Sequence, residues 1–218
     1  CLRLTTFGRG ESDLASEIEP LPLPEGVVMG YRASMPIIEL KLNGPTSKLP
    51  EMEQFWQQVR DIAGESTLFE GTEGLPAQLS RRLQEQHHQL AISEQFTAGL
   101  VQYQLASVQA PLAAGNVLPA QDESLAELMQ RAKQLAEAGK ASLALVVGAE
   151  KDHHLGFALY TPQGCWSQRV KFSNNRHGLK ARQDVVAMMA LNMLRRWMEG
   201  LDVSGGHGWI EVVETQQG

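Results

Sequence analysis

The stretch of sequence that decides the fold is QLAISEQFTAGL, residues 89–100. Its first five residues, 89–93, are typical of a buried strand, and the pattern that follows predicts a helix over 97–108. The turn between them holds small and polar residues. The helix N-terminus is therefore expected to offer free N–H groups and a positive partial charge to a phosphate or carboxylate. The alternative is that Ser93 or Thr97 only caps the helix.

The same alternation of strand and helix patterns continues to the end of the chain. Apolar runs predict strands, and apolar residues at spacings of three and four predict helices. The expected strands cover residues 89–93, 115–119, 141–148, 157–160 and 165–172. The expected helices cover residues 75–86, 97–108, 124–139 and 184–200, with Asp122 or Ser124 as the cap of the third. Such an order predicts a three-layer α/β domain over residues 73–218.

The first 72 residues follow a different order. Strands are expected over 2–7, 27–32, 36–42 and 66–69, and helices over 14–18 and 50–63. Two strand–helix–strand halves of this size form a split-βαβ layout, with an antiparallel sheet on one side and two helices on the other. Glycine, proline and charge meet at residues 70–76, which marks a boundary. Residues 1–72 are therefore predicted to form a separate small α+β module.

Composition narrows the possible partners. Of the 218 residues, 43% are hydrophobic and 20% are charged, which is a globular composition. The net charge is −6, and residues 1–72 carry six Lys and Arg against eleven Asp and Glu. Nucleic acids and anionic lipid surfaces favour basic proteins, so neither is expected as a partner. The longest apolar stretches fall short of the roughly 20 residues that span a bilayer, so no membrane segment is expected.

The two cysteines, Cys1 and Cys165, lie far apart and have no Cys-x-x-Cys spacing. A disulfide framework is therefore not expected, and a reducing cytoplasm is the predicted location. The chain begins without a methionine and enters directly into a strand pattern. From this start we expect a fragment of a longer protein.

The histidines and the basic residues predict no metal site and one possible anion site. The histidine pairs at 87–88 and 153–154 place adjacent rings on different faces, and no acidic or cysteine cluster has ligand spacing. No metal and no cofactor are therefore expected. Arg176, Lys180 and Arg182 form a basic cluster that enters the last long helix and could receive an anionic ligand. A solvated face is the alternative.

One segment carries a family resemblance. The sequence EQFTAG, residues 94–99, resembles the Ala-Glu-Ser-Cys-Thr-Gly-Gly segment in the C-terminal domain of the CinA (competence- and damage-inducible) family. The likeness continues at AGNV (114–117), at LVVG (145–148) and at Phe172, Arg176, Arg182, Ala190 and Leu191. Residues 1–72, which contain FGRGES (7–12), resemble the family's KH-like module. The resemblance implies a deamidase-like α/β domain in a bacterial cytoplasm, associated in the family with deamidation of nicotinamide mononucleotide (NMN).

The chain departs from the family at the positions that would carry out the chemistry. Gln95 stands where the family has its catalytic serine, Pro119 where it has a tyrosine, and Ser124 where a lysine follows. A loop with glycine and proline in the family becomes VGAEKD, residues 147–152. An amide has no O–H group to activate as a nucleophile. The chain is therefore expected to keep the deamidase-like fold but to lack the catalytic nucleophile.

The leading expectation is a nucleotide-binding or assembly module without deamidase activity. Its ligand would be a small phosphorylated nucleotide similar to NMN. The expected ligand contacts are Gln95, Thr97, Ala98, Gly99, Arg176, Lys180 and Arg182. One alternative is a working amidohydrolase that uses Ser93 or Thr97 as its nucleophile. The other alternative is RNA binding by the KH-like module. The net negative charge of this module and its lack of a Gly-x-x-Gly motif argue against RNA binding.

Two further partners follow from the resemblance. The family resemblance implies a homodimer, and the helix over 184–201 is apolar on more than one face. Such a helix must be covered on each face, by its own domain or by another copy as well. The second partner would be the family's molybdopterin-binding-like domain of the same protein, placed before Cys1.

Overall fold

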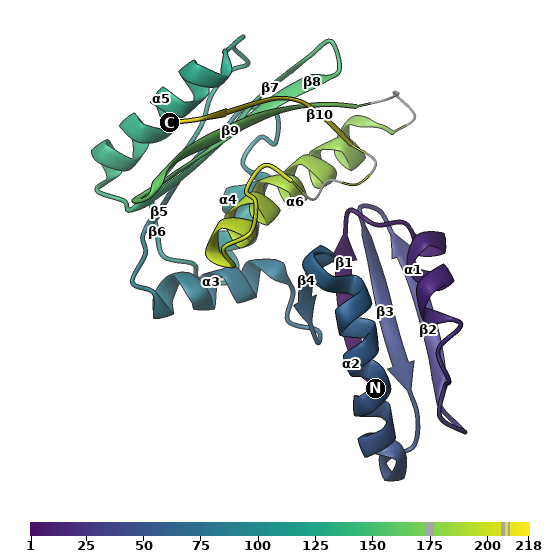
Figure 1. Cartoon of the computed structure of the whole chain (residues 1–218). Helices are drawn as coiled ribbons and strands as arrows, with labels where there is room; N and C mark the ends of the chain where they lie inside the picture. The colour runs from purple at the N-terminus through teal and green to yellow at the C-terminus, as the bar shows by residue number, and fades with distance from the viewer. Residues whose placement is uncertain (173–176, 206–207, 209) are drawn as a thin grey trace. The chain divides into compact units, whose positions relative to one another are not determined.

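A computed structural model describes residues 1–172, 177–205, 208 and 210–218. The chain divides into two compact units, one over Cys1–Gly74 and the other over Leu75–Gly205 with Ile210–Gly218 (Figure 1). Each unit has a sheet of its own, with strand order β2-β3-β1-β4 in the first and β10-β9-β8-β7-β5-β6 in the second. The predicted fold class, an α/β domain that follows a small α+β module, is confirmed. No helix in the described part of the chain is long and apolar enough to cross a membrane.

The first unit has the split-βαβ order. Its elements are β1 (Leu2–Phe7), α1 (Glu11–Ile18), β2 (Val28–Ser34), β3 (Ile37–Asn43), α2 (Leu49–Ala63) and β4 (Thr67–Glu70). Strand β1 pairs antiparallel with both β3 and β4, and β2 pairs antiparallel with β3. Strand β2 is therefore an edge of this sheet.

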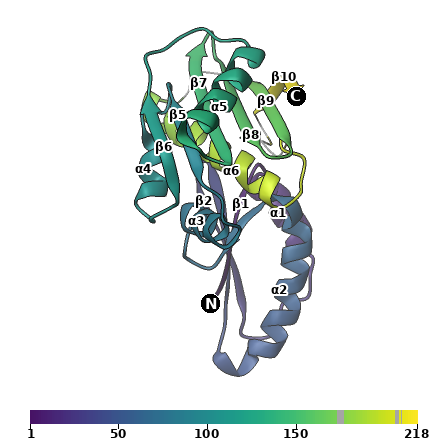
Figure 2. The ribbon, with the colours of Figure 1, turned by 90° about the vertical axis from the view of Figure 1, so that its left-hand side faces the viewer.

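The core of the first unit lies between the two helices and the sheet. Apolar residues at helical spacing on α2, among them Met52 and Trp56, pack on Leu40 and Leu42 of the sheet. Helix α2 ends at Ala63 and is followed by Gly64, whose φ of 50° is costly for residues with a Cβ. Figure 2 shows α2 running alongside the strands. The amphipathic pattern of the sequence thus produces the expected layer of helix on sheet.

The second unit begins with α3. Its elements are α3 (Leu75–Glu85), β5 (Leu90–Glu94), α4 (Leu100–Ala106), β6 (Leu112–Val117), α5 (Leu125–Gly139), β7 (Leu143–Lys151), β8 (His154–Thr161), β9 (Gly164–Lys171), α6 (Leu179–Met198) and β10 (Glu211–Gln217). Strand β5 is parallel to β6 and to β7, and the pairs from β7 to β10 are antiparallel.

Helices cover both faces of this second sheet. Helix α5 lies on one face, and α3, α4 and α6 lie on the other (Figure 1). Small residues on the sheet, such as Ala91, Ala144 and Ala158, let the α5 residues Leu128 and Ala132 approach closely. The predicted three-layer arrangement is observed.

Several boundaries differ from those expected from the sequence, and one strand was missed. Helix α4 begins at Leu100 rather than 97, because Ala98 and Gly99 take positive φ values of 52° and 93° and form a turn. Strands β7 and β8 extend to a tight turn at Asp152 and His153, where a charged loop was expected. Helix α6 begins at Leu179 instead of 184. Strand β10 was not predicted at all.

Helix α6 was expected to need a partner for its second apolar face. Most of its residues between Val185 and Arg196 are buried within the chain itself. Its apolar character is therefore explained without another copy, and the homodimer loses this support.

Candidate functional site

The central strand β5 ends at a fully buried carboxylate. The Glu94 side chain accepts hydrogen bonds from Thr97 Oγ1 at 2.6 Å, from the Val101 N–H at 2.8 Å and from the Gln102 N–H at 3.1 Å. Gln102 Nε2 adds a fourth at 2.9 Å and also donates to the carbonyl oxygen of Asn116 on β6. A buried carboxylate is stabilised by donors of this kind. Glu94 thus caps α4 from inside the protein.

This cap reduces the number of N–H groups that the turn at 95–99 can offer to an anion. The phosphate contact expected there rested on free N–H groups at the start of the helix. Glu94 already uses two of these groups, and the Ala98 N–H donates to the carbonyl oxygen of Gln95 at 3.1 Å. The Leu100 N–H donates to the Thr97 carbonyl oxygen at 3.0 Å. Several of the N–H groups on which the expected contact rested therefore already have acceptors within the chain, and the ligand contact at Gln95, Thr97, Ala98 and Gly99 stays a prediction.

Gln95 belongs to a chain of four side chains, which we name the Gln95 network: Gln95, Glu123, Arg131 and Ser93. Gln95 Nε2 donates to Glu123 Oε1 at 2.7 Å. The Arg131 guanidinium donates to both carboxylate oxygens of Glu123, each at 2.8 Å. Nη1 of Arg131 also donates to the Ser93 hydroxyl oxygen. The Gln95 amide oxygen accepts from the Gln121 N–H at 3.3 Å. The network ties the end of β5 to α5 and to the loop before it.

Ser93 and Thr97, the two alternative nucleophiles, are both buried, and each hydroxyl is hydrogen-bonded to another side chain. A serine or threonine becomes a nucleophile when an adjacent group accepts its proton. Ser93 faces the guanidinium of Arg131, which is only a donor. Thr97 donates to Glu94, whose carboxylate already caps the helix. Both hydroxyls therefore have structural partners.

Ser124 and Pro119, the other two positions at which the chain departs from the family pattern, lie at a helix start and in a loop. Ser124 is the N-cap of α5, where its Oγ accepts from the Glu127 N–H at 3.1 Å. The Glu127 carboxylate accepts from the Ser124 N–H at 2.7 Å, which completes a capping box. Pro119 is exposed in the loop between β6 and α5. Neither residue offers a group that transfers protons near neutral pH.

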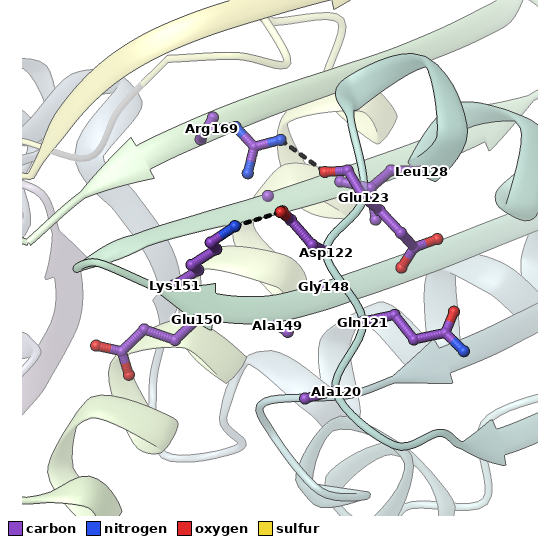
Figure 3. A pocket seen from close by; sticks show the side chains of 11 residues that line it. Ala120, Gln121, Asp122, Glu123, Leu128, Gly148, Ala149, Glu150, Lys151 and Arg169 are labelled. Carbon is purple, nitrogen blue, oxygen red and sulfur yellow. Dashed lines mark hydrogen bonds and ion pairs between the residues drawn. The ribbon is translucent and has the colours of Figure 1, made fainter.

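A cavity of about 180 Å³ opens beside the Gln95 network (Figure 3). It is bounded by the loop before α5, by the ends of β7 and β8, and by β9. Its polar and charged lining residues are Gln121, Asp122, Glu123, Glu150, Lys151 and Arg169. Of the sequence-predicted site residues that the structure describes, none lines this cavity. The charged segment 147–152 was the only signal for it, because the other lining residues come from distant parts of the sequence.

Ion pairs organise the wall of the cavity. The ammonium of Lys151 meets the carboxylate of Asp122 across the mouth (Figure 3). Their hydrogen bond, reinforced by the opposite charges, lowers the pKa of Asp122 and raises the pKa of Lys151. Arg169 Nη2 donates to the carbonyl oxygen of Glu123 at 2.8 Å. The cavity therefore presents charges of both signs.

The predicted basic cluster is only partly assembled. Arg182 Nη2 donates to the Glu150 carboxylate at 3.1 Å, which places Arg182 just behind the cavity wall. Its Nε is buried and has no hydrogen-bond partner among the described residues. Lys180 is exposed and pairs with Asp184 at 2.6 Å. Arg176 lies outside the described residues.

Neither cysteines nor histidines form a metal centre in the described part of the chain, where no three metal-binding side chains cluster. His88 accepts or donates at 2.9 Å with Ser142, and its ring meets Trp197 edge to face at 5.5 Å. Burial lowers the pKa of His88. Cys1 and Cys165 are both free thiols.

The chain is similar over nearly its whole length to curated CinA-like proteins. Over 215 residues, 99% of its length, the chain is 55% identical to the CinA-like protein of Shigella flexneri. It is equally similar to the NMN amidohydrolase-like protein YfaY of Escherichia coli (strain K12). The chain is homologous to these proteins, so its resemblance to the CinA family is confirmed.

The chain matches these relatives over only part of their length. The chain spans about half, 54%, of the length of these curated relatives. The structure of a competence or damage-inducible protein from Enterobacter asburiae superposes with a TM-score of 0.50 at 13% identity. That match covers 59% of this chain and 99% of the other, and it concerns the fold alone. No protein-family model matches the chain.

Proposed function

We propose that the unit from Leu75 is a catalytically silent relative of NMN amidohydrolases, which binds one end of a small phosphorylated nucleotide without hydrolysing it. The observation that carries this proposal is the 2.7 Å hydrogen bond from Gln95 to Glu123. It turns the position that corresponds to the family's serine into a structural link.

Hydrolysis of a carboxamide needs several groups together. A nucleophile attacks the carbonyl carbon, a base takes its proton, and an acid protonates the departing ammonia. Gln95 has no O–H group, and the buried hydroxyls of Ser93 and Thr97 are held by Arg131 and Glu94. Among the described residues, Ser93 has no base beside it, and Thr97 donates to a carboxylate that already accepts helix N–H groups, so the amide bond of a bound ligand is expected to stay intact.

The cavity supports binding. Arg169 and Lys151, which pair with Glu214 and Asp122, can offer further donors to a phosphate. Glu123 and Glu150, which pair with Arg131 and Arg182, can offer further acceptors to hydroxyl and amide groups. The unpartnered Nε of Arg182, behind Glu150, is a further donor. Arg is suited to a phosphate because it can donate two parallel hydrogen bonds.

The size of the cavity limits the affinity. Ligand pockets that enclose a whole drug-sized molecule measure about 300–1,000 Å³, whereas this cavity measures about 180 Å³. Only one end of a mononucleotide would be enclosed, so a dissociation constant on the order of 0.1–1 mM is expected.

Two assays test the proposal. Ammonia release from NMN by the intact chain should stay at background. Calorimetric titration with NMN should detect binding that Arg182→Ala and Arg169→Ala weaken, with Lys133→Ala, at an exposed lysine of α5 outside this cavity, as the matched control. Turnover that survives Ser93→Ala and Thr97→Ala would show that the reacting group lies elsewhere. Absence of binding at several millimolar NMN, or binding indifferent to Arg182 and Arg169, would leave the unit with a purely structural role.

A further inference from the structure

Strand β2 presents an open backbone edge in the sheet of the first unit (Figure 1). All of its cross-strand partners lie on β3, in a register that runs without a shift over residues 28–34. In the described part of the chain, no backbone hydrogen bond joins these residues to any other element. The N–H and C=O groups of alternate residues of β2 therefore point away from the sheet without a protein partner.

Two other sheet edges carry features that discourage pairing, and β2 lacks them. Strand β4, the opposite edge of the same sheet, has four residues and a register shift against β1. Strand β10 carries two glutamates and a register shift against β9. Strand β2 has seven residues, no proline and one charged side chain, Arg32. Proteins normally protect a long regular edge, so an unprotected one indicates that a further strand pairs with it.

Positive charge is in excess on the outer face of this edge. Arg32 lies directly opposite Glu39 of β3, and it is exposed and has no hydrogen bond or ion pair with any residue that the structure describes. Glu39 already pairs with Lys41 at 2.6 Å and lies 4.0 Å from Arg3. Three cations thus surround one carboxylate, and this face of β2 favours an acidic side chain on a neighbouring strand.

The other face of β2 has the opposite character. Met29 and Tyr31 pack against the core beneath the helices. Burial, and then the charges of Glu19 and Glu11, raise the pKa of Tyr31. An acidic side chain on this face would meet like charges, whereas an apolar one would extend the packing beside Met29. Successive side chains of a strand point to opposite faces. A strand that pairs with β2 is therefore expected to alternate acidic and apolar residues.

We propose that β2 binds an extended peptide segment of another protein, which joins the sheet as a further strand and alternates acidic with apolar residues. Backbone hydrogen bonds would supply the affinity and Arg32 the preference for acidic side chains. A second copy of β2 is disfavoured, because antiparallel pairing of two β2 strands would place both Arg32 side chains on one face. Salt screens the more distant acidic residues of the unit over roughly 8–10 Å, so the nearest charges dominate.

Two peptides of equal length and similar strand propensity test the proposal. The acidic probe is acetyl-Thr-Val-Glu-Val-Glu-Val-Thr-amide, and the basic probe has lysine in place of both glutamates. Each is titrated into the isotope-labelled intact chain and followed by backbone amide NMR. The acidic probe is expected to shift amides of residues 28–34, to slow their hydrogen exchange, and to bind about fivefold more tightly than the basic probe. Slower exchange separates strand addition from contact through side chains alone.

Substitutions of Arg32 test the preference for acidic side chains. Arg32→Ala should bind the two probes equally, and Arg32→Glu should favour the basic probe. Lys133→Glu, which makes the same change of charge at an exposed residue of the other unit, is the matched control and should behave as the parent. Unchanged amide exchange in β1 and β3 shows that the variants keep their fold.

Four results would overturn the proposal. These are no shifts in residues 28–34 at several millimolar acidic probe, equal binding of the two probes by the parent, a preference that both Arg32 variants retain, and shifts of these amides that depend on protein concentration alone. The last would mean that a second copy occupies the edge. None of these measurements involves NMN, so the proposed function is tested separately.

Discussion

The side-chain amide of Gln95 donates to the carboxylate of Glu123 across 2.7 Å, joining the end of β5 to the loop before α5. A serine at this position would be too short to make the same link. Gln95 and Glu123, which Arg131 holds in place, therefore belong to one local arrangement.

Gln95→Ser alone is expected to leave ammonia release from NMN at background. The substitution supplies a hydroxyl, but Pro119 and Ser124 remain at the positions where the family resemblance implies a tyrosine and a lysine. The triple variant Gln95→Ser, Pro119→Tyr, Ser124→Lys should release ammonia measurably, because nucleophile and proton-transfer groups are then present together. Activity of the single variant equal to that of the triple would contradict this.

Glu94→Ala is expected to destabilise the second unit by roughly 2–4 kcal/mol, because it leaves the buried N–H groups of Val101 and Gln102 without their acceptor. Urea unfolding measures the change. Ser124→Ala, which removes the exposed cap of α5, is the control and should cost about 1 kcal/mol. Equal losses in the two variants would mean that the buried carboxylate is no more than an ordinary cap.

Lys151→Ala should raise the pKa of Asp122 toward its ordinary value of about 3.9, since the Lys151 hydrogen bond and charge hold that pKa down. A carboxyl with a lowered folded pKa stabilises the fold above its unfolded pKa, and this contribution is lost as the pH falls through the folded pKa. Both side chains are exposed, so the effect on stability should be small. Carboxyl NMR titration measures the pKa, and Lys180→Ala, which removes a different exposed pair, should leave it unchanged.

Cys165 should be unreactive in the folded protein. The thiolate is the reactive form of cysteine, and burial raises the pKa of the Cys165 thiol to about 11. With a disulfide reagent at pH 8, the exposed Cys1 should react promptly and Cys165 only after unfolding. The Cys165→Ser variant, the control, should match the parent in its native reaction. Rapid reaction of both thiols in the native state would show that the packing between α5 and the sheet opens readily.

The homodimer stays a prediction, and the structure offers it a different surface from α6. Strand β6 is an edge of the second sheet, and beside it Val117 and Tyr103 are 53% and 72% exposed. Sedimentation at tens of micromolar should give twice the chain mass, and Val117→Lys should reduce it to a monomer. The matched control Leu23→Lys, at an exposed apolar residue of the first unit, should remain dimeric. A monomer mass for the parent chain would refute the prediction.

The sequence predicted the elements whose burial follows a strong period. Helix α5 carries buried residues at Leu125, Leu128, Ala132 and Ala136, a helical stripe, and β7 is a continuous apolar run. The pattern could not predict β10, because its sequence EVVETQQ is mostly polar and exposed. Such a strand forms because β9 offers it backbone partners.

The candidate site was harder to predict than the fold. The passage from strand β5 to a helix was predicted, although the helix was expected to start three residues too early. The capping role of Glu94 was missed, because acidic residues are rarely buried. The cavity residues Asp122, Glu150 and Arg169 lie on three separate segments that only the folded sheet brings together. Their partners in space depend on strand order, which the sequence pattern does not encode.

The exposed polar character of β10 has a consequence for how far an assembly can grow. Unpaired strand edges recruit further strands, and charged side chains discourage this. Glu211 and Glu214 lie on β10, which pairs on one side only, with β9. Two copies joined at their β6 edges would carry β10 at both outer margins of the combined sheet. The addition of chains would then stop at two, and the same polar edge would protect the protein against fibrous aggregation.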